Sequence, residues 1–458
     1  MRIRKYDVDY SRRLFLERTA QGAFATGVLA PLWPLIASGD MSKAYPDELT
    51  SVEMYTKGKV KTGDVLTASN VDAVKDLLDP ITFQQIKTMG RRITVVETVK
   101  DPTLLYPMAF LETSLKNKGK AKLGADGNIV DQAGDSWLGG IPFAEPKTGE
   151  EAIANLTLSW GRHDYCQYAI RQWDISPGGD PAYQYDFVWA ELQANARLDG
   201  TSFQNKKDLL RIQSVWFTSP QDVAGSSFLS TWYYDQHKYP DLYGYLPAFK
   251  RVRQFPTNQR FEPLLPGITW FLSDAWAAGD PMLTWGNYKI VGRQPMLGAV
   301  SQNWHGSRKN WEIGVHGGPK GQTFLDANFS MCPECIVLEA EPVGYPRAPV
   351  GKKRVWIDVR NQQFVAYITY DRRGEIWKSF EVGWSRYQDG STLVKDPKGN
   401  SEWSWTYVLS HDIQANRMSR AAHTESCAGG YKSQLADNGV DVYNKYLTNQ
   451  AITRLGQA

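Results

Sequence analysis

Four cysteines and six histidines are the side chains best suited to redox or metal chemistry in this sequence. Cys332 and Cys335 flank Pro-Glu, which is the spacing of a dithiol redox motif or of half a zinc site. A thioredoxin-like site requires this motif to open a helix, whereas residues 336–340 have the composition of a strand. The pattern favours a structural disulfide between Cys332 and Cys335 across a tight turn, or two thiols in a loop. Cys166 and Cys427 form a further potential pair.

Other catalytic motifs are weak. His163 and Cys166 are close enough in sequence to share a metal ion, but two ligands do not complete a site. The sequence contains no His-Glu-x-x-His motif, no phosphate-binding glycine loop and no Gly-x-Ser-x-Gly nucleophile elbow. His316-Gly317-Gly318 is similar to an oxyanion loop, yet without a serine elbow it predicts a turn. The sequence therefore indicates no catalytic residue, no metal site and no cofactor.

The elements that must position these residues are mostly strands. From about residue 160 onward, apolar residues recur with period two rather than 3.6. Residues 354–359, 364–368 and 376–382 are joined by linkers short enough for hairpins, which predicts an antiparallel meander, although Lys378 interrupts the apolar face. Further strands are predicted at residues 165–175, 187–198, 209–218, 226–234, 248–254, 288–292 and 403–409.

Aromatic residues occupy both faces of several predicted strands. In residues 226–234, Phe228, Trp232 and Tyr234 lie opposite Leu229 and Tyr233. A sheet with water on one side does not require this arrangement. The pattern indicates a large, strongly curved antiparallel sheet whose concave side holds helices or a ligand, or else a thick β-sandwich core.

Helices are predicted at both ends of the strand-rich region. Their ranges are 70–89, interrupted by Pro80, then 148–158, opened by a Thr148–Glu151 capping box, and 441–454. Residues 118–135 predict an exposed loop or hairpin. Together these elements predict a mainly β fold with flanking helices in one domain over residues 45–458. Its N-terminal part (about 45–160) is helical, its middle (about 160–425) strand-rich, and a helix (about 441–454) ends it.

The N-terminal 44 residues have the pattern of an export signal. Ser11–Glu17 reads Ser-Arg-Arg-Leu-Phe-Leu-Glu and resembles the twin-arginine consensus, and a weakly apolar stretch containing Pro31 and Pro34 follows. This order predicts a twin-arginine signal peptide and a periplasmic mature protein that is exported folded. The same 44 residues carry the whole formal net charge of +3, so the remainder is neutral. A neutral body disfavours nucleic-acid binding.

Four groups of motifs follow one another along the chain. They are Gly-Gly-Ile-Pro-Phe at 139–143 with Pro-Lys-Thr-Gly-Glu-Glu-Ala at 146–152, Tyr-Leu-Pro at 245–247 with Lys-Arg-Val-Arg at 250–253, Trp-Gly-Asn-Tyr-Lys-Ile-Val-Gly at 285–292, and Arg-Val-Trp at 354–356 with Tyr-Asp-Arg-Arg-Gly-Glu-Ile-Trp at 370–377. In this order they resemble a proteobacterial envelope family called domain of unknown function 1329, and the resemblance covers roughly residues 47–384. The twin-arginine signal and the Cys332–Cys335 motif depart from the pattern expected of the family.

The resemblance implies a fold like that of the Lol lipoprotein carriers, a half-open antiparallel barrel with helices filling an apolar concavity. It also implies a periplasmic carrier of a lipid or other hydrophobic small molecule. Inner-membrane export pumps and outer-membrane proteins are the partners that the family suggests. No catalytic residues follow from the resemblance.

Three functions remain open from the sequence. The favoured one is a hydrophobic-cargo carrier rather than an enzyme. Its predicted lining residues are aromatic, and two arginines are candidates for binding a carboxylate or phosphate head group, because a guanidinium presents a matching fork of donors. The predicted residues are Phe228, Trp232, Tyr234, Trp270, Trp285, Tyr367, Trp377, Arg251 and Arg253. The alternatives are a periplasmic oxidoreductase or metal-dependent enzyme, and an envelope assembly protein.

Overall fold

The computed structural model describes residues 45, 47–159, 161–256, 260–274, 280–301 and 308–457. The predicted signal peptide, residues 1–44, lies outside the described residues. A 15-stranded sheet dominates the fold, with the strand order β1-β2-β14-β15-β16-β17-β20-β21-β5-β6-β7-β8-β9-β10, and β11 also pairs with β14. The path through the sheet is open, and its strands pair antiparallel except for the parallel pair β2–β14. The predicted fold class, a mainly β protein built on a large curved antiparallel sheet, is confirmed.

Two runs of consecutive hairpins make up the sheet. The first run contains β5 (Tyr165–Ile175), β6 (Pro181–Gln193), β7 (Leu209–Ser219), β8 (Ser227–Tyr233), β9 (Asp241–Leu246) and β10 (Arg251–Phe255). The second contains β11 (Gly286–Gly298), β14 (Ala327–Glu341), β15 (Val350–Asp358), β16 (Gln363–Asp371), β17 (Ile376–Arg386), β20 (Trp403–Asp412) and β21 (Arg417–Thr424). Pairing of β21 with β5 joins the two runs, and β1 (Val65–Leu66) and β2 (Ile93–Val95) extend the sheet beside β14.

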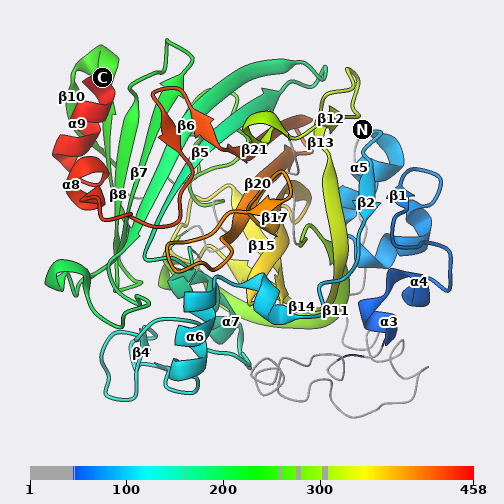
Figure 1. The fold of residues 1–458 in the computed structure, drawn as a ribbon, viewed down its shortest axis with the longest axis horizontal. Coiled ribbons are helices and arrows are strands. Elements are labelled where there is room, and N and C mark those ends of the chain that lie inside the picture. The colour runs from blue at the N-terminus through cyan, green and yellow to red at the C-terminus, as the bar shows by residue number, and fades with distance from the viewer. Residues whose placement is uncertain are drawn as a thin grey trace.

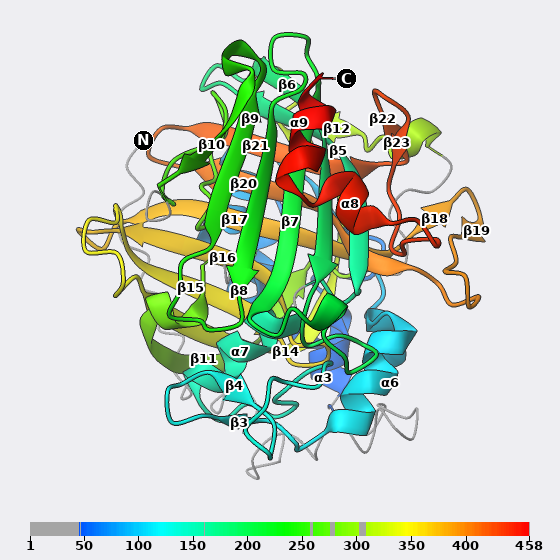
Figure 2. The ribbon, with the colours of Figure 1, turned by 90° about the vertical axis from the view of Figure 1, so that its left-hand side faces the viewer.

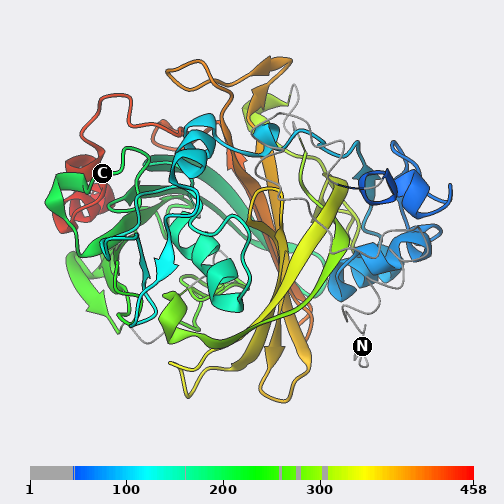
Figure 3. The same ribbon diagram turned by 90° about the horizontal axis from the view of Figure 1, so that it is seen from below.

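The sheet curves so that its two arms face each other (Figure 3), with α6 (Met108–Asn117) and α7 (Gly149–Ser159) between them. On the outside of the second run lie α3 (Asp47–Thr50), α4 (Val52–Tyr55), the 3₁₀ helix η1 (Val71–Leu77) and α5 (Pro80–Thr88) (Figure 1). Figure 2 shows α8 (Val442–Tyr446) and α9 (Asn449–Gln457) against the outer side of the first run. Both faces are therefore covered, which explains aromatics on both sides of one strand.

Local sequence explains where the helices begin. The Asp79 carboxylate accepts from the amides of Ile81 and Thr82, and Pro80 occupies the first turn of α5. The capping box of α7 forms with the Glu151 amide donating to Thr148 Oγ1 at 3.2 Å, while Glu151 accepts from the Lys147 amide at 2.6 Å. No helix in the described parts of the chain has the length and hydrophobicity that crossing a bilayer requires.

Smaller elements complete the chain. The predicted loop or hairpin at residues 118–135 contains the hairpin of β3 (Lys122–Leu123) and β4 (Ile129–Val130). His316 ends β12 before the predicted turn, and its ring accepts from the Arg92 amide at 2.8 Å. The remaining short elements are η2 (Pro102–Leu105), η3 (Phe203–Asn205), η4 (Pro247–Phe249), η5 (Met282–Thr284), η6 (Lys309–Trp311), β12 (Val315–His316), β13 (Phe324–Leu325), β18 (Gln388–Asp389), β19 (Thr392–Leu393), β22 (Ser426–Cys427) and β23 (Tyr431–Lys432).

Helix α5 and the residues that follow it are joined to the outer face of the sheet by buried polar contacts. Gln85 Nε2 lies 3.1 Å from His411 Nδ1, and Arg91 pairs with Glu381 at 2.6 Å. Burial lowers the pKa of His411 to about 4, so the folded protein holds this imidazole neutral at pH values where an unfolded chain protonates it.

This histidine predicts a loss of stability in acid. Between its unfolded pKa of about 6.5 and its folded pKa of about 4 the unfolded chain binds the extra proton, so stability falls as the pH falls. We expect His411 to contribute about 3 kcal/mol of the loss between pH 7 and pH 4. Urea titrations of His411→Gln at pH 7, 5.5 and 4 should show a flatter pH dependence than the wild type. Exposed His237→Gln is the control, and an unchanged slope for His411→Gln would contradict the prediction.

Candidate functional site

Alternate residues of each strand line the concave face of the sheet, because successive side chains in a strand point to opposite faces. On the first arm, Phe228 of β8 pairs in register with Val215 of β7. On the second arm, Tyr367 of β16 lies opposite Phe380 of β17, and the two rings stack with centroids 5.1 Å apart. These residues belong to the main buried hydrophobic cluster, so the concave face is rich in aromatic side chains.

Three of the predicted lining residues lie on or beside β8. Phe228 packs against Phe255 with ring centroids 6.0 Å apart. Trp232 donates its indole N–H to Gln213 Oε1 at 2.7 Å. Tyr234 donates its hydroxyl to the Ile129 carbonyl at 2.7 Å, so this residue joins β8 to the β3–β4 hairpin. The structure therefore places Phe228, Trp232 and Tyr234 together on the first arm.

Four other predicted residues divide into two groups. Trp270 lies between β10 and β11, with its ring 6.2 Å from that of Phe380, so it belongs with Tyr367 on the second arm. Trp285 is buried in a separate cluster around Tyr345, against which Trp377 also packs. Lys353 Nζ lies 4.7 Å from the Trp285 ring centroid and 4.8 Å from that of Tyr367, so the two groups meet at this amine.

Arg251 and Arg253 are exposed on β10, the last strand of the first arm. Arg253 pairs in register with Gly244, which pairs with Phe228, so Arg253 shares the concave face at its rim. Its guanidinium lies 4.4 Å from the centroid of the Phe249 ring. Neither arginine forms an ion pair with a carboxylate in the described ranges. Their predicted role at the mouth of the site stays a prediction.

Residues 260–274, here called the internal segment, lie against the concave face of the second arm. The Thr269 amide donates to Ser419 Oγ at 2.9 Å, and Lys378 Nζ donates to the Thr269 carbonyl at 2.6 Å. Lys353 Nζ donates to the Ser273 carbonyl at 2.9 Å. The Lys378 that interrupts the apolar pattern of its strand is therefore explained by a polar contact inside the protein.

Charged residues accompany the aromatics on this face. Lys353 and Lys378 are buried, and burial lowers the pKa of both amines, although the nearby Asp274 carboxylate opposes the shift. Asp174 of β5 is also buried, which raises its pKa to about 6 against the opposing hydrogen bond from Ser419. The concave face therefore offers both apolar surface and buried charge, and only Lys378 had given a signal of this in the sequence.

The sequence matches the family described as "Protein of unknown function (DUF1329)" over residues 65–453. The chain belongs to the DUF1329 family. The match confirms the resemblance that the ordered motifs predicted. No curated protein matches the chain.

Three solved structures are similar to this DUF1329 chain at low sequence identity. A DUF1329 family protein from Desulfovibrio piger ATCC 29098 has 14% identity and a TM-score of 0.42, covering 64% of this chain and 95% of that one. A putative outer membrane lipoprotein-sorting protein domain from Vibrio parahaemolyticus has 15% identity and a TM-score of 0.38, covering 64% and 92%. A LolA superfamily protein from Nitrosomonas europaea has 13% identity and a TM-score of 0.34, covering 65% and 98%.

The cysteine motif of this DUF1329 protein differs from the sequence prediction. Cys332 and Cys335 lie inside β14 rather than in a turn or loop, because β11 and β15 pair with that strand on both sides. The register with β11 shifts between Gln294 and Met296, which marks a bulge at the motif. Both thiols are buried and free, so the predicted disulfide is not formed. The described residues contain no group of three or more potential metal ligands.

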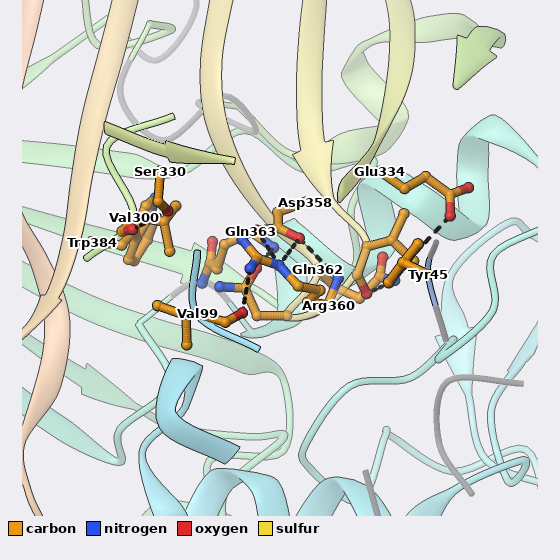
Figure 4. A network of polar contacts seen from close by, with 12 residues as sticks. Tyr45, Val99, Val300, Ser330, Glu334, Asp358, Arg360, Gln362, Gln363 and Trp384 are labelled. Carbon is orange, nitrogen blue, oxygen red and sulfur yellow. Dashed lines mark hydrogen bonds and ion pairs between the residues drawn. The ribbon is translucent and has the colours of Figure 1, made fainter. Parts of the chain in front are cut away.

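A buried polar network holds this part of the DUF1329 fold together (Figure 4). Arg360, in the β15–β16 turn, pairs with Asp358 at 2.6 Å, and both side chains are 0% exposed. Arg360 Nη1 also donates to the Val99 carbonyl at 2.7 Å. Nearby, Glu334 of β14 pairs with Arg293 at 2.9 Å and accepts from the Tyr45 hydroxyl at 3.5 Å. These contacts join N-terminal segments to the sheet and indicate a structural role.

Proposed function

We propose that this DUF1329 protein is a periplasmic carrier that holds a lipid or another hydrophobic small molecule against the concave face of its sheet. The observation that supports this most is the cluster of buried aromatic side chains on the inside of both arms, represented by Phe228 and Trp232 on one arm and Tyr367 and Phe380 on the other. Aromatic side chains provide a large apolar contact area. The internal segment, held by polar contacts, provides a second wall for the cargo.

The energy available to such a site is adequate for retention of an acyl chain. Each buried methylene contributes about 0.8 kcal/mol, so a chain of about a dozen carbons gains close to 10 kcal/mol before the cost of ordering it. The predicted twin-arginine signal supports delivery of the folded protein to the periplasm. An inner-membrane export pump and an outer-membrane protein are the proposed partners, with Arg251 and Arg253 at the rim where a head group or a partner would arrive.

The proposal is tested by native mass spectrometry and lipid extraction of protein released from the periplasm of its native host. A carrier should retain an apolar ligand, and the emptied protein should take up a fluorescent fatty acid. Recovery without ligand in repeated preparations, together with no uptake of the probe, would contradict the proposal.

Blocking the concave face should abolish uptake. Ser230 of β8 is half-buried between Phe228 and Trp232 on that face, where it pairs with Gln213 and Leu242. Ser230→Trp adds a large ring to the space that the cargo would occupy, so we expect uptake of the fluorescent fatty acid to fall at least about tenfold. Binding titrations measure this loss.

The next residue provides the matched control. Thr231 is also half-buried in β8 but points to the opposite face. Thr231→Trp should bind the probe as the wild type does, provided that both variants have wild-type circular dichroism. Equal loss in the two variants would place the cargo elsewhere.

A further inference from the structure

Arg211 of β7 is a buried cation whose hydrogen-bonding capacity is largely unused. It is 2% exposed, and its Nε and Nη1 atoms have no hydrogen-bond partner. Its register partner on β8 is Trp232, and its guanidinium lies 4.8 Å from the centroid of that ring. Since Arg211, Gln213 and Val215 alternate along β7, Arg211 shares the concave face with Phe228 and Trp232.

A second arginine, Arg260, also contacts Trp232. Its guanidinium lies 5.2 Å from the centroid of that ring. Arg260 has a buried carboxylate partner, Asp280. Arg211 has no such ion pair among the residues that the structure describes. The carboxylate that most favours the charged guanidinium is Glu191 of β6, which itself accepts a hydrogen bond from Gln213 Nε2. Arg260 therefore has a direct ion pair, whereas Arg211 has only the longer-range field of Glu191 and keeps two donors without an acceptor.

Such an arrangement is costly unless something compensates it. Burial of an ionised group without a paired charge is unfavourable, and each buried donor without an acceptor adds to that cost. Consistent with this cost, burial lowers the pKa of Arg211 while Glu191 opposes the shift. Arginine also presents a planar fork of donors that fits carboxylate and phosphate oxygens. An anion at the free edge of this guanidinium would satisfy both its charge and its N–H groups.

We propose that Arg211 binds the anionic group, a phosphate or a carboxylate, of an amphiphilic cargo inside the concave face. This inference rests on the proposed carrier function and specifies its cargo as an anionic amphiphile rather than an uncharged hydrocarbon. The head group lies against Arg211 and Trp232, and the acyl chain lies along the aromatic residues of the arms. Exposed Arg251 and Arg253 at the rim then contact the cargo only during entry.

The test compares three twelve-carbon probes and one free anion on the delipidated full-length mature protein. Dodecyl phosphate and dodecanoate should bind roughly 10- to 100-fold more tightly than uncharged dodecanol, which is the range expected for hydrogen bonds to a charged group. Arg211→Met should abolish this preference without weakening dodecanol binding. Arg211→Lys keeps the positive charge but loses the planar fork of N–H donors, so it should retain part of the preference for the anionic probes. Isothermal titration calorimetry measures all affinities.

Stability provides an independent readout. Because the buried Glu191 carboxylate favours the Arg211 charge, this readout is taken in a Glu191→Gln background: adding Arg211→Met there removes a buried cation without an ion pair, so the urea midpoint in the absence of ligand should equal or exceed that of Glu191→Gln alone. If Arg211 serves ligand binding, Arg211→Met should lose the preference for anionic probes while its stability in this background is unchanged or higher. A purely structural arginine predicts lower stability, and that result would overturn the proposal.

Arg420 of β21 is a matched control. It is 3% exposed, its Nε and Nη1 atoms also lack partners, and its guanidinium lies 4.6 Å from the Trp173 ring centroid. It follows Ser419, whose side chain contacts the internal segment, so Arg420 points to the convex face. Arg420→Met should bind all probes as the wild type does.

The remaining outcomes are distinct. Equal binding of charged and uncharged probes, unaffected by Arg211→Met, would overturn the role of Arg211 and leave the carrier function standing. Failure of every twelve-carbon probe to bind would overturn the carrier function and the inference with it. A third outcome is that inorganic phosphate binds as tightly as dodecyl phosphate, with this binding lost in Arg211→Met. That result would identify a free anion as the ligand and would overturn the proposal of an amphiphilic cargo.

Discussion

Replacement of Arg360 by methionine is expected to destabilise the protein by about 3–5 kcal/mol. The Asp358–Arg360 pair is fully buried, and the guanidinium also donates to the Val99 carbonyl. Removal of the arginine leaves the Asp358 carboxylate without its counter-charge and the Val99 carbonyl without a donor. Urea unfolding followed by tryptophan fluorescence should show a markedly lower midpoint for Arg360→Met.

Two further variants separate this pair from surface charge. Asp358→Asn combined with Arg360→Met removes both charges and should recover part of the loss, because no unpaired ion remains. Arg373→Met breaks the exposed pair with Asp371, at 3.0 Å, and should leave the midpoint unchanged. A midpoint for Arg360→Met close to that of Arg373→Met would show that the buried pair is not structural.

Replacement of Lys378 by methionine is expected to release the internal segment. Lys378 Nζ is buried, donates to the Thr269 carbonyl, and lies 3.5 Å from the Asp274 carboxylate. Without it Asp274 loses its ion pair and keeps only the longer-range field of buried Lys353, which costs about 3 kcal/mol and is relieved if residues 260–274 leave the face. Amides of this segment that have low exchange rates, such as Thr269 and Phe271, should then exchange over 100-fold faster with deuterium, since every 1.4 kcal/mol is about tenfold.

Lys352 provides the comparison for this variant. It pairs with Glu339 at 2.9 Å but is partly exposed, with a relative side-chain exposure of 33%. Lys352→Met should therefore leave hydrogen exchange in residues 260–274 at wild-type rates. If Lys378→Met also leaves these rates unchanged, the amine does not hold the segment, and other contacts such as Lys353 to Ser273 do so.

Strands with regular alternation could be predicted from the sequence, and those with mixed signals could not. The predicted strand at residues 165–175 matches β5, and the predicted 403–409 lies within β20. Strand β14 was predicted only near residues 336–340, because Pro333 within the cysteine motif indicates a turn. In the folded protein, β11 absorbs the irregularity through a bulge, which is a tertiary effect without a local signature.

The C-terminal helix shows the same limit. The sequence predicts one helix over residues 441–454, whereas the structure has α8 and α9. The interruption falls at Thr448, whose hydroxyl accepts from the Ala451 amide and so caps a new helix. A threonine is compatible with either a helix interior or a cap, and packing against the sheet decides between them.

The sequence indicated aromatic residues on β8 but not the buried charges beside them. Phe228 and Trp232 lie on the concave face, and their role in lining a cargo site stays a prediction. Arginines were chosen at residues 251 and 253 because they are paired in sequence, but a pattern does not distinguish a rim position from a buried one. Arg211 stands among apolar neighbours in its strand, and its missing partner is visible only once adjacent strands are in register.

The seam between β21 and β5 has a consequence for biosynthesis. Thr424 and Ala169, which meet there, are 255 positions apart. As the nascent chain leaves the ribosome, β5 to β10 can pair locally long before β21 is synthesised. Until then the backbone groups at the edge of β5 are unpaired, and an incorrect strand can pair with them. A chain that ends before residue 417 lacks β21, so its β5 edge stays unpaired, and a chaperone that shields β5 during translation would protect the yield.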